Sequence, residues 1–184
     1  MEKQGIKETD RKVCEELSKL FPGYVPSPLV DGEESAMMLS KEMKNGIAYR
    51  YELSVSNAAH HAGETNVDIG NSALANSLHE RAHDLVMQLA LKRAGITDLN
   101  NITAIQNYNF GIEKRKIATD VYTYCFSNES EKEIRTVCKS EISERSSYSG
   151  CELIAESIVQ YLGDVKYCQL SKKVYNYIAK EWRR

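Results

Sequence analysis

One long helical pattern constrains the fold of this chain more than any other segment. Between Ser72 and Ala94, leucines recur at spacings of four and seven residues, which places them on one face of an α-helix. Gly95 follows, and glycine commonly ends helices because it adopts left-handed backbone angles without steric cost. The pattern predicts a helix over residues 72–94 that buries this face against other elements. The leucines of the face are Leu74, Leu78, Leu85 and Leu89.

The middle of this predicted helix carries the five residues His79-Glu80-Arg81-Ala82-His83. Histidines four positions apart lie one above the other on a helix, close enough to bind one metal ion together. Imidazole nitrogen suits Zn²⁺, and a catalytic zinc site takes three protein ligands and leaves a fourth position open. Glu80 is then placed to act as general base on water that the metal activates. The segment therefore predicts a zinc site with His79 and His83 as two ligands.

The same segment also fits an ordinary polar helix face. Arg81 and Asp84 are charged on either side of the second histidine, where motifs of this kind usually carry uncharged residues. In this interpretation His79 and His83 are solvated and bind no metal. A third ligand elsewhere in the chain would distinguish the two interpretations.

A second helical segment, residues 151–162, offers such a ligand. Glu152 and Glu156 are four positions apart and project from one face of the helix, among apolar residues such as Leu153 and Ile158. A carboxylate from a second helix completes a zinc site of two histidines and one glutamate. The other carboxylate can accept a hydrogen bond from the outer nitrogen of a ligating histidine. A glutamate pair on a solvated face is the alternative, which the apolar surroundings disfavour.

The histidine motif and the segment "ISERSSYSGCELIAESI", residues 142–158, together resemble a known family. Zincin-like metallopeptidase domains attached to phage minor-head and head-morphogenesis proteins carry HExxH followed by ISxYAxTNxxExFAExF, and the catalytic domain of anthrax lethal factor shares this pattern. The resemblance covers about residues 47–162, in two short blocks. It implies a zincin-like fold and a zinc-dependent endopeptidase. It also implies a peptide or protein substrate, with phage structural proteins as candidates.

The resemblance implies a role for each matched position. His79 and His83 become the first two zinc ligands, and Glu80 becomes the catalytic base. Glu152 becomes the third ligand, and Glu156 becomes the carboxylate that supports a ligating histidine. Thermolysin-like enzymes place a ligand glutamate and a supporting carboxylate at the same spacing, which favours Glu152 over Glu156 as the ligand.

The second block departs from the family pattern at the position of a tyrosine that stabilises the oxyanion. Arg145 stands there, and its guanidinium can also stabilise developing negative charge, while Tyr148 lies three residues further along. Cys151, beside the ligand glutamate, is either a further ligand or a plain buried thiol. These departures leave a second hypothesis open. In it, the chain is a zincin-like structural or interaction domain for phage head assembly that hydrolyses peptides weakly or not at all.

Outside these blocks the sequence predicts an α+β domain. Residues 47–55 alternate apolar and polar side chains with the period of a half-buried strand, and residues 66–70 suggest a second short strand. These strands would form a small antiparallel sheet, whose edge at residues 66–69 would receive the substrate. Further helices are expected at 9–20, 33–43, 112–125, 132–142, 151–162 and 171–182.

The chain of 184 residues is long enough for one domain with a sizeable core. We expect a single zincin-like domain over 1–184, with N-terminal helices in 1–45, the sheet and motif helix in 47–95, and a helical part with the third ligand in 96–184.

Composition narrows the partners and the compartment. A net charge of -2 lacks the cationic excess typical of nucleic-acid binding, and no apolar run approaches a membrane span of about 20 residues. The first residues are polar and do not resemble a secretory signal. The five cysteines are odd in number and form no CxxC pair, which predicts reduced thiols. We therefore expect a cytoplasmic protein that binds neither nucleic acid nor membrane, although phage association or export without a signal peptide is compatible with the sequence.

Overall fold

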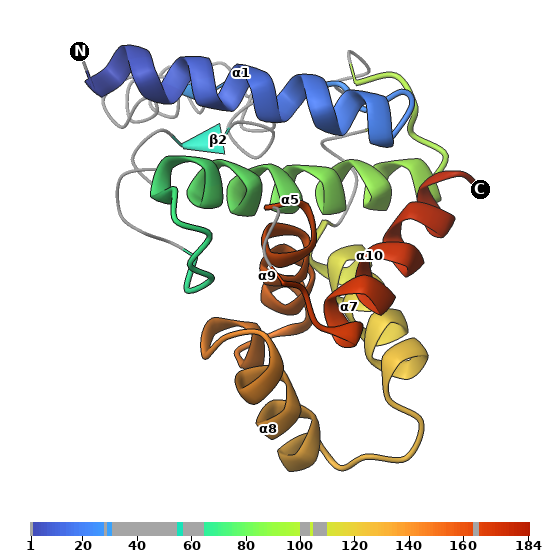
Figure 1. The fold of residues 1–184 in the computed structure, drawn as a ribbon. Helices are drawn as coiled ribbons and strands as arrows, with labels where there is room; N and C mark the ends of the chain where they lie inside the picture. The colour runs from blue at the N-terminus through green and yellow to red at the C-terminus, as the bar shows by residue number, and fades with distance from the viewer. Residues whose placement is uncertain are drawn as a thin grey trace, which may run out of the picture.

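The structure is a computed structural model that describes residues 2–27, 29–30, 55–56, 65–99, 104, 110–163 and 166–184. Within these residues the protein is mostly helical (Figure 1). The main helices are α1 (Glu2–Leu20), α5 (Ser72–Arg93), α7 (Phe110–Cys125), α8 (Glu131–Glu141), α9 (Gly150–Leu162) and α10 (Gln169–Trp182), with a short 3-10 helix η1 (Arg145–Ser147) before α9.

The predicted α+β fold with an antiparallel sheet is wrong. In the described part of the chain, extended pairing is confined to β1 (Leu29–Val30) and β2 (Val55–Ser56), which are two residues long and run parallel to each other. Strands in sheets usually have about five or six residues, so this pairing forms no layer of the fold. The predicted helix at 33–43 and most of the predicted strand at 47–55 lie outside the described residues.

The second predicted strand, at residues 66–70, is also wrong, because local side chains take its backbone donors. The amide of Val67 donates to Oγ1 of Thr65 at 3.1 Å, and the amide of Gly70 donates to Oδ1 of Asp68 at 2.8 Å. Short polar side chains that bond to nearby backbone in this way compete with sheet formation. Residues 66–69 therefore offer no strand edge for a substrate.

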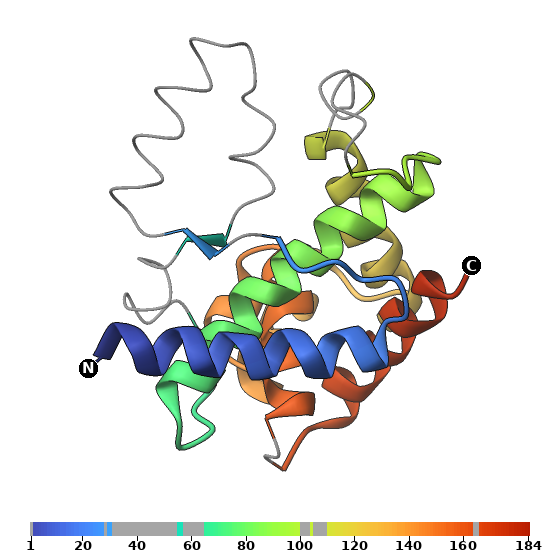
Figure 2. The ribbon, with the colours of Figure 1, turned by 90° about the horizontal axis from the view of Figure 1, so that it is seen from above.

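Helix α5 lies at the centre of the described structure. It begins at the N-cap Asn71, whose side chain accepts a hydrogen bond from the amide of Leu74 at 3.1 Å, and it ends before Gly95, which has a positive φ of 76°. The predicted helix is confirmed to within one residue. Leu85 and Leu89 are fully buried, because α1 packs on one side of α5, while α7 and α9 pack on the other (Figures 1 and 2).

A buried ion pair fixes α1 to α5. The side chain of Arg81 is only 2% exposed, and its Nε and Nη2 donate to the two carboxylate oxygens of Asp10 at 2.8 and 2.6 Å. Its Nη1 donates to the carbonyl oxygen of Ser27 at 2.6 Å. Two parallel charge-assisted hydrogen bonds define the relative position of the two helices. Arg81 thus faces α1 and takes no part in the histidine cluster.

Asp84 extends the same buried network. Its carboxylate accepts hydrogen bonds from the hydroxyl of Tyr24 at 2.6 Å, from the hydroxyl of Ser27 at 2.5 Å and from Nε2 of Gln88 at 3.1 Å. Arg81 and Asp84, the two charged residues that differ from usual zinc motifs, therefore hold the segment after α1 against α5. Their presence is explained by helix packing and is compatible with a metal site on the other face of α5.

Helix α9 is held between α5, α7 and α10 by a nearly continuous apolar surface. Its first residue, Gly150, permits close contact with α7, because a Cβ atom there would lie only 2.6 Å from Cβ of Ala118. Ser149 caps the helix by accepting from the amide of Glu152. The first turn of α9 is thereby fixed in position. The fully buried apolar residues of α9 are Leu153, Ile154, Ala155, Ile158 and Val159.

The remaining predicted helices agree with α1, α7, α8, α9 and α10 in type, with ends that differ by up to seven residues. None of the helices in the described ranges combines the length and apolar character needed to cross a membrane. The five cysteines are free thiols, of which Cys125 and Cys138 are buried.

Candidate metal centre

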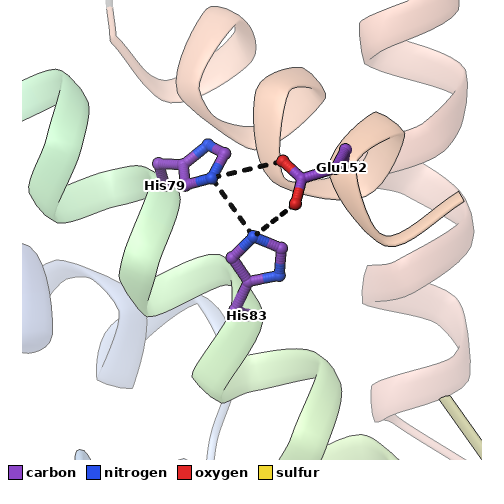
Figure 3. A group of neighbouring side chains, drawn as sticks. All are labelled: His79, His83 and Glu152. Carbon is purple, nitrogen blue, oxygen red and sulfur yellow. Dashed lines mark hydrogen bonds and ion pairs between the residues drawn. The ribbon is translucent and has the colours of Figure 1, made fainter. Parts of the chain in front are cut away.

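The packing of α5 against α9 brings three side chains to one point. Nε2 of His79 lies 3.1 Å from Nε2 of His83, and these nitrogens lie 3.4 and 3.5 Å from the two carboxylate oxygens of Glu152 (Figure 3). One nitrogen or oxygen atom from each of these three residues lies within 4.8 Å of the other two. Among the described residues, His79, His83 and Glu152 form the group that could hold a metal ion.

The separations within this group are close to those around a tetrahedral metal ion. Zinc bonds of about 2.0–2.2 Å to nitrogen and oxygen, at the tetrahedral angle, hold the ligand atoms roughly 3.4 Å apart. The two histidine nitrogens lie 3.1 Å apart, and each lies 3.4 or 3.5 Å from a different oxygen of Glu152, so one ligand atom from each residue falls within 4.8 Å of the others. His79, His83 and Glu152 are therefore arranged as the three protein ligands of such a site.

Glu156 orients the first of the two histidines. Its Oε1 lies 2.8 Å from Nδ1 of His79, and neither side chain is exposed to solvent. A carboxylate accepts hydrogen bonds, so Nδ1 of His79 carries the proton and Nε2 presents a lone pair toward His83 and Glu152. This is the tautomer that a metal ligand requires.

Further hydrogen bonds keep the Glu156 carboxylate ionised inside the protein. Its Oε2 accepts from the hydroxyl of Ser143 at 2.6 Å and from the backbone amide of Asn66 at 3.0 Å. Burial raises the pKa of Glu156, but hydrogen bonds from His79, Ser143 and Thr65 outweigh burial and bring the pKa below its usual value. Glu156 thus keeps a negative charge next to Nδ1 of His79, on the side of the ring opposite Nε2.

His83 is held in the neutral form that binds metals. Burial, together with the neighbouring His79 and Arg145, lowers the pKa of His83 well below its usual value. Its side chain remains 30% exposed, whereas that of His79 is fully buried. A metal ion would therefore reach the centre from the side of His83, and it would not need to displace a proton from this ring at neutral pH.

The two residues at the expected oxyanion position occupy different surroundings. Nε of Arg145, in η1, donates to Oε2 of Glu152 at 2.7 Å, so this guanidinium lies directly against the group of ligands. Tyr148, which follows η1, has 60% of its surface exposed. The structure thus brings Arg145 to the centre and leaves Tyr148 at the protein surface.

The other candidate residues are sequence neighbours of the proposed ligands. Glu80 follows His79 in α5 and is partly buried. Cys151 precedes Glu152 in α9 and is also partly buried, and burial raises the pKa of its thiol. The sulfur of Cys151 is not among the convergent ligand atoms of the described residues. A buried thiol is therefore the interpretation that fits Cys151.

Sequence reasoning missed two contributors to the centre. Ser143 and the backbone of Asn66 both donate to Glu156; the sequence assigns no role to Ser143 and places Asn66 in a substrate-binding strand edge instead. Ser143 lies in the segment at residues 142–158 that resembles the family pattern, and this position was the signal that could have identified it. A backbone amide carries no side-chain signal, so the contribution of Asn66 could come only from the tertiary structure.

Substitution of Glu156 by alanine is expected to weaken zinc binding about 10- to 100-fold, because carboxylates that orient a ligating histidine have effects of this size. Competition with a chromophoric zinc chelator measures the change. Ser143→Ala, which removes one hydrogen bond and leaves the carboxylate in place, should have a smaller effect. Equal zinc affinity in Glu156→Ala and the unaltered protein would show that Glu156 does not support the site.

Comparison of the chain with protein-family models, with curated proteins and with solved structures found no match.

Proposed function

We propose that this protein is a zinc-dependent endopeptidase. The observation that carries the proposal is the convergence of one ligand atom each from His79, His83 and Glu152 within 4.8 Å, with Glu80 next to the first histidine in the sequence. The net charge of the centre supports a divalent cation. Glu152 and Glu156 contribute two negative charges, and Arg145 contributes one positive charge. The two sequence blocks resemble zincin-like phage domains, and this resemblance adds support for the activity. The proposal does not include the antiparallel sheet of the zincin-like fold.

Zinc held by these ligands would polarise the scissile carbonyl and lower the pKa of a water molecule. Glu80 would take a proton from the attacking water and deliver it to the leaving amine. Arg145, whose Nε donates to Glu152, would have to exchange this partner to stabilise negative charge on the carbonyl oxygen. Glu156 would hold His79 in the required tautomer throughout.

The proposed substrate is a peptide or protein segment. The sequence resemblance makes phage structural proteins the first candidates. Residues 66–69 form no strand edge, so the substrate would have to bind along other surfaces beside the histidines.

Glu80→Gln is expected to retain zinc and to lose peptide hydrolysis by about 10²- to 10⁴-fold, the usual contribution of a general base. Mass spectrometry of a peptide mixture incubated with each protein measures cleavage, and elemental analysis measures zinc in the same samples. The amide is nearly isosteric with the carboxylate, so folding should be unaffected. Hydrolysis that persists in Glu80→Gln, or that persists without any metal in active protein, would contradict the proposed mechanism.

A second candidate function is a zinc-binding structural or interaction domain with weak or no hydrolysis. The observation that favours it is the ion pair between Arg145 and Glu152, at 2.7 Å. A guanidinium engaged with the ligand carboxylate is not free to stabilise an oxyanion, and Tyr148 faces solvent. Stoichiometric zinc without cleavage of any peptide would favour this alternative over the peptidase.

A further inference from the structure

Helix α8 and η1 border an open groove of about 560 Å³, away from the metal ligands. Three cationic side chains of α8 line this groove, at spacings of three and four residues that place them on one helix face. Hydroxyl groups lie between and beside them. The cations are Lys132, Arg135 and Lys139, and the hydroxyl residues are Ser130, Thr136 and Ser147.

The positive charges of this groove are available to a ligand. Arg135 pairs with Glu131 at 2.7 Å, but the two side chains are largely exposed. Lys139 pairs with Glu144 in a similarly exposed position. Exposed ion pairs contribute only about 0–1 kcal/mol, so each cation can exchange its partner for a carboxylate of a bound molecule. With Glu131 included, the lining carries three positive charges and one negative charge, in a chain whose net charge is -2.

The 3-10 helix η1 connects the groove to the metal centre along the chain. Ser147 lines the groove and ends η1, while Arg145 begins η1 and donates to Glu152. The exposed Tyr148 follows directly, and exposed tyrosines beside grooves are common peptide contacts. A chain bound along α8 would therefore lie against the end of η1, the element whose first residue contacts Glu152.

We propose that this groove binds an acidic peptide segment. The cations from Lys132 to Lys139 span roughly 10 Å along the helix axis, which an extended peptide covers in about three residues. A short run of acidic side chains can thus meet all three cations. A polyphosphate backbone carries a charge at every unit and would meet the carboxylates of Glu131 and Glu144, whereas a peptide can alternate acidic with neutral residues. Binding of an acidic peptide in this groove does not depend on the proposed peptidase function. The use of the groove as a subsite for substrate does rest on that function.

Fluorescence anisotropy with a short labelled peptide of alternating glutamate and glycine tests this proposal. The double variant Lys132→Ser/Lys139→Ser should bind this peptide about fivefold more weakly, if each cation contributes about 0.5 kcal/mol. The matched variant Lys12→Ser/Lys19→Ser removes two exposed, paired lysines from α1 and should bind like the unaltered protein. A peptide with glutamine in place of glutamate should not bind, and added salt should weaken the glutamate peptide.

Three results would overturn the proposal: no binding of the glutamate peptide, equal weakening in both double variants, or tighter binding of single-stranded RNA of the same charge. The titrations are run in a chelator and repeated with His83→Ala. Peptide binding that survives in a protein unable to hold zinc would support a groove that acts independently of the metal, and failure of the separate hydrolysis assay would then refute only the peptidase. Loss of peptide binding at normal zinc content would refute only the groove.

Discussion

Replacing Glu152 with alanine is expected to lower zinc from about one ion per chain to a trace, with an affinity loss of more than about 100-fold. The reason is that Glu152 is the proposed oxygen ligand from α9, and its loss would leave two histidines from α5 alone. Removal of a carboxylate that merely supports a ligand already weakens binding 10- to 100-fold, so removal of a ligand should exceed this. Elemental analysis of the purified protein, after equilibration with zinc and dialysis, measures the change.

His83→Ala should give the same loss, while Glu144→Ala provides the matched control. Glu144 is an exposed glutamate immediately before Arg145, paired with Lys139 and not among the convergent ligand residues. Full zinc content in Glu152→Ala would remove this residue from the ligand set and bring Glu156 or Cys151 forward. If the unaltered protein holds no zinc even after zinc is supplied, His79 and His83 are not metal ligands and form only a hydrogen-bonded pair on a helix.

Arg81→Ala is expected to lower the free energy of unfolding by about 3–5 kcal/mol, because it leaves the carboxylates of Asp10 and Asp84 buried without their cation. For a chain of this length the midpoint temperature should fall by on the order of 10 °C. Urea denaturation of the metal-free protein, followed by circular dichroism, measures the loss without any contribution from bound zinc.

Arg11→Ala is the control for this measurement, since Arg11 pairs with Glu8 and Glu15 on the exposed face of α1. Exposed pairs of this kind contribute about 0–1 kcal/mol, so the control should stay near the stability of the unaltered protein. The double variant Arg81→Met/Asp10→Asn should lose less than the sum of the two single changes, because the two residues form one unit. A loss below about 1 kcal/mol in Arg81→Ala would show that the pair does not hold α1 to α5.

Helix positions could be predicted because their signals are local. The leucine spacing of α5 and the following Gly95 lie within one segment, and the observed ends, Ser72 and Arg93, agree with the pattern. The same holds for α9 and α10, whose apolar faces repeat with the helical period. Periodicity reports which face of an element is apolar, so it predicts elements well and their partners poorly.

The sheet could not be predicted from the same kind of signal. Residues 66–69 look like a short strand because Val67 and Ile69 alternate with polar residues. A strand needs a neighbour for its amides, and here the amide of Asn66 donates to Glu156, ninety positions away. The partner of a backbone amide depends on which elements lie beside it, and a short alternating run does not contain that information.

The sequence by itself determined which residues share a helix face. Spacings of four put His79 with His83, and Glu152 with Glu156, because the α-helix turns once in 3.6 residues. Only the tertiary structure decided that these two faces meet, that Glu156 orients His79, and that Arg145 contacts Glu152. It also turned Arg81 and Asp84 toward α1, away from the histidines. The physical reason is that side-chain direction follows from local backbone geometry, whereas contact between distant segments follows from how the apolar surfaces of α5, α7 and α9 pack.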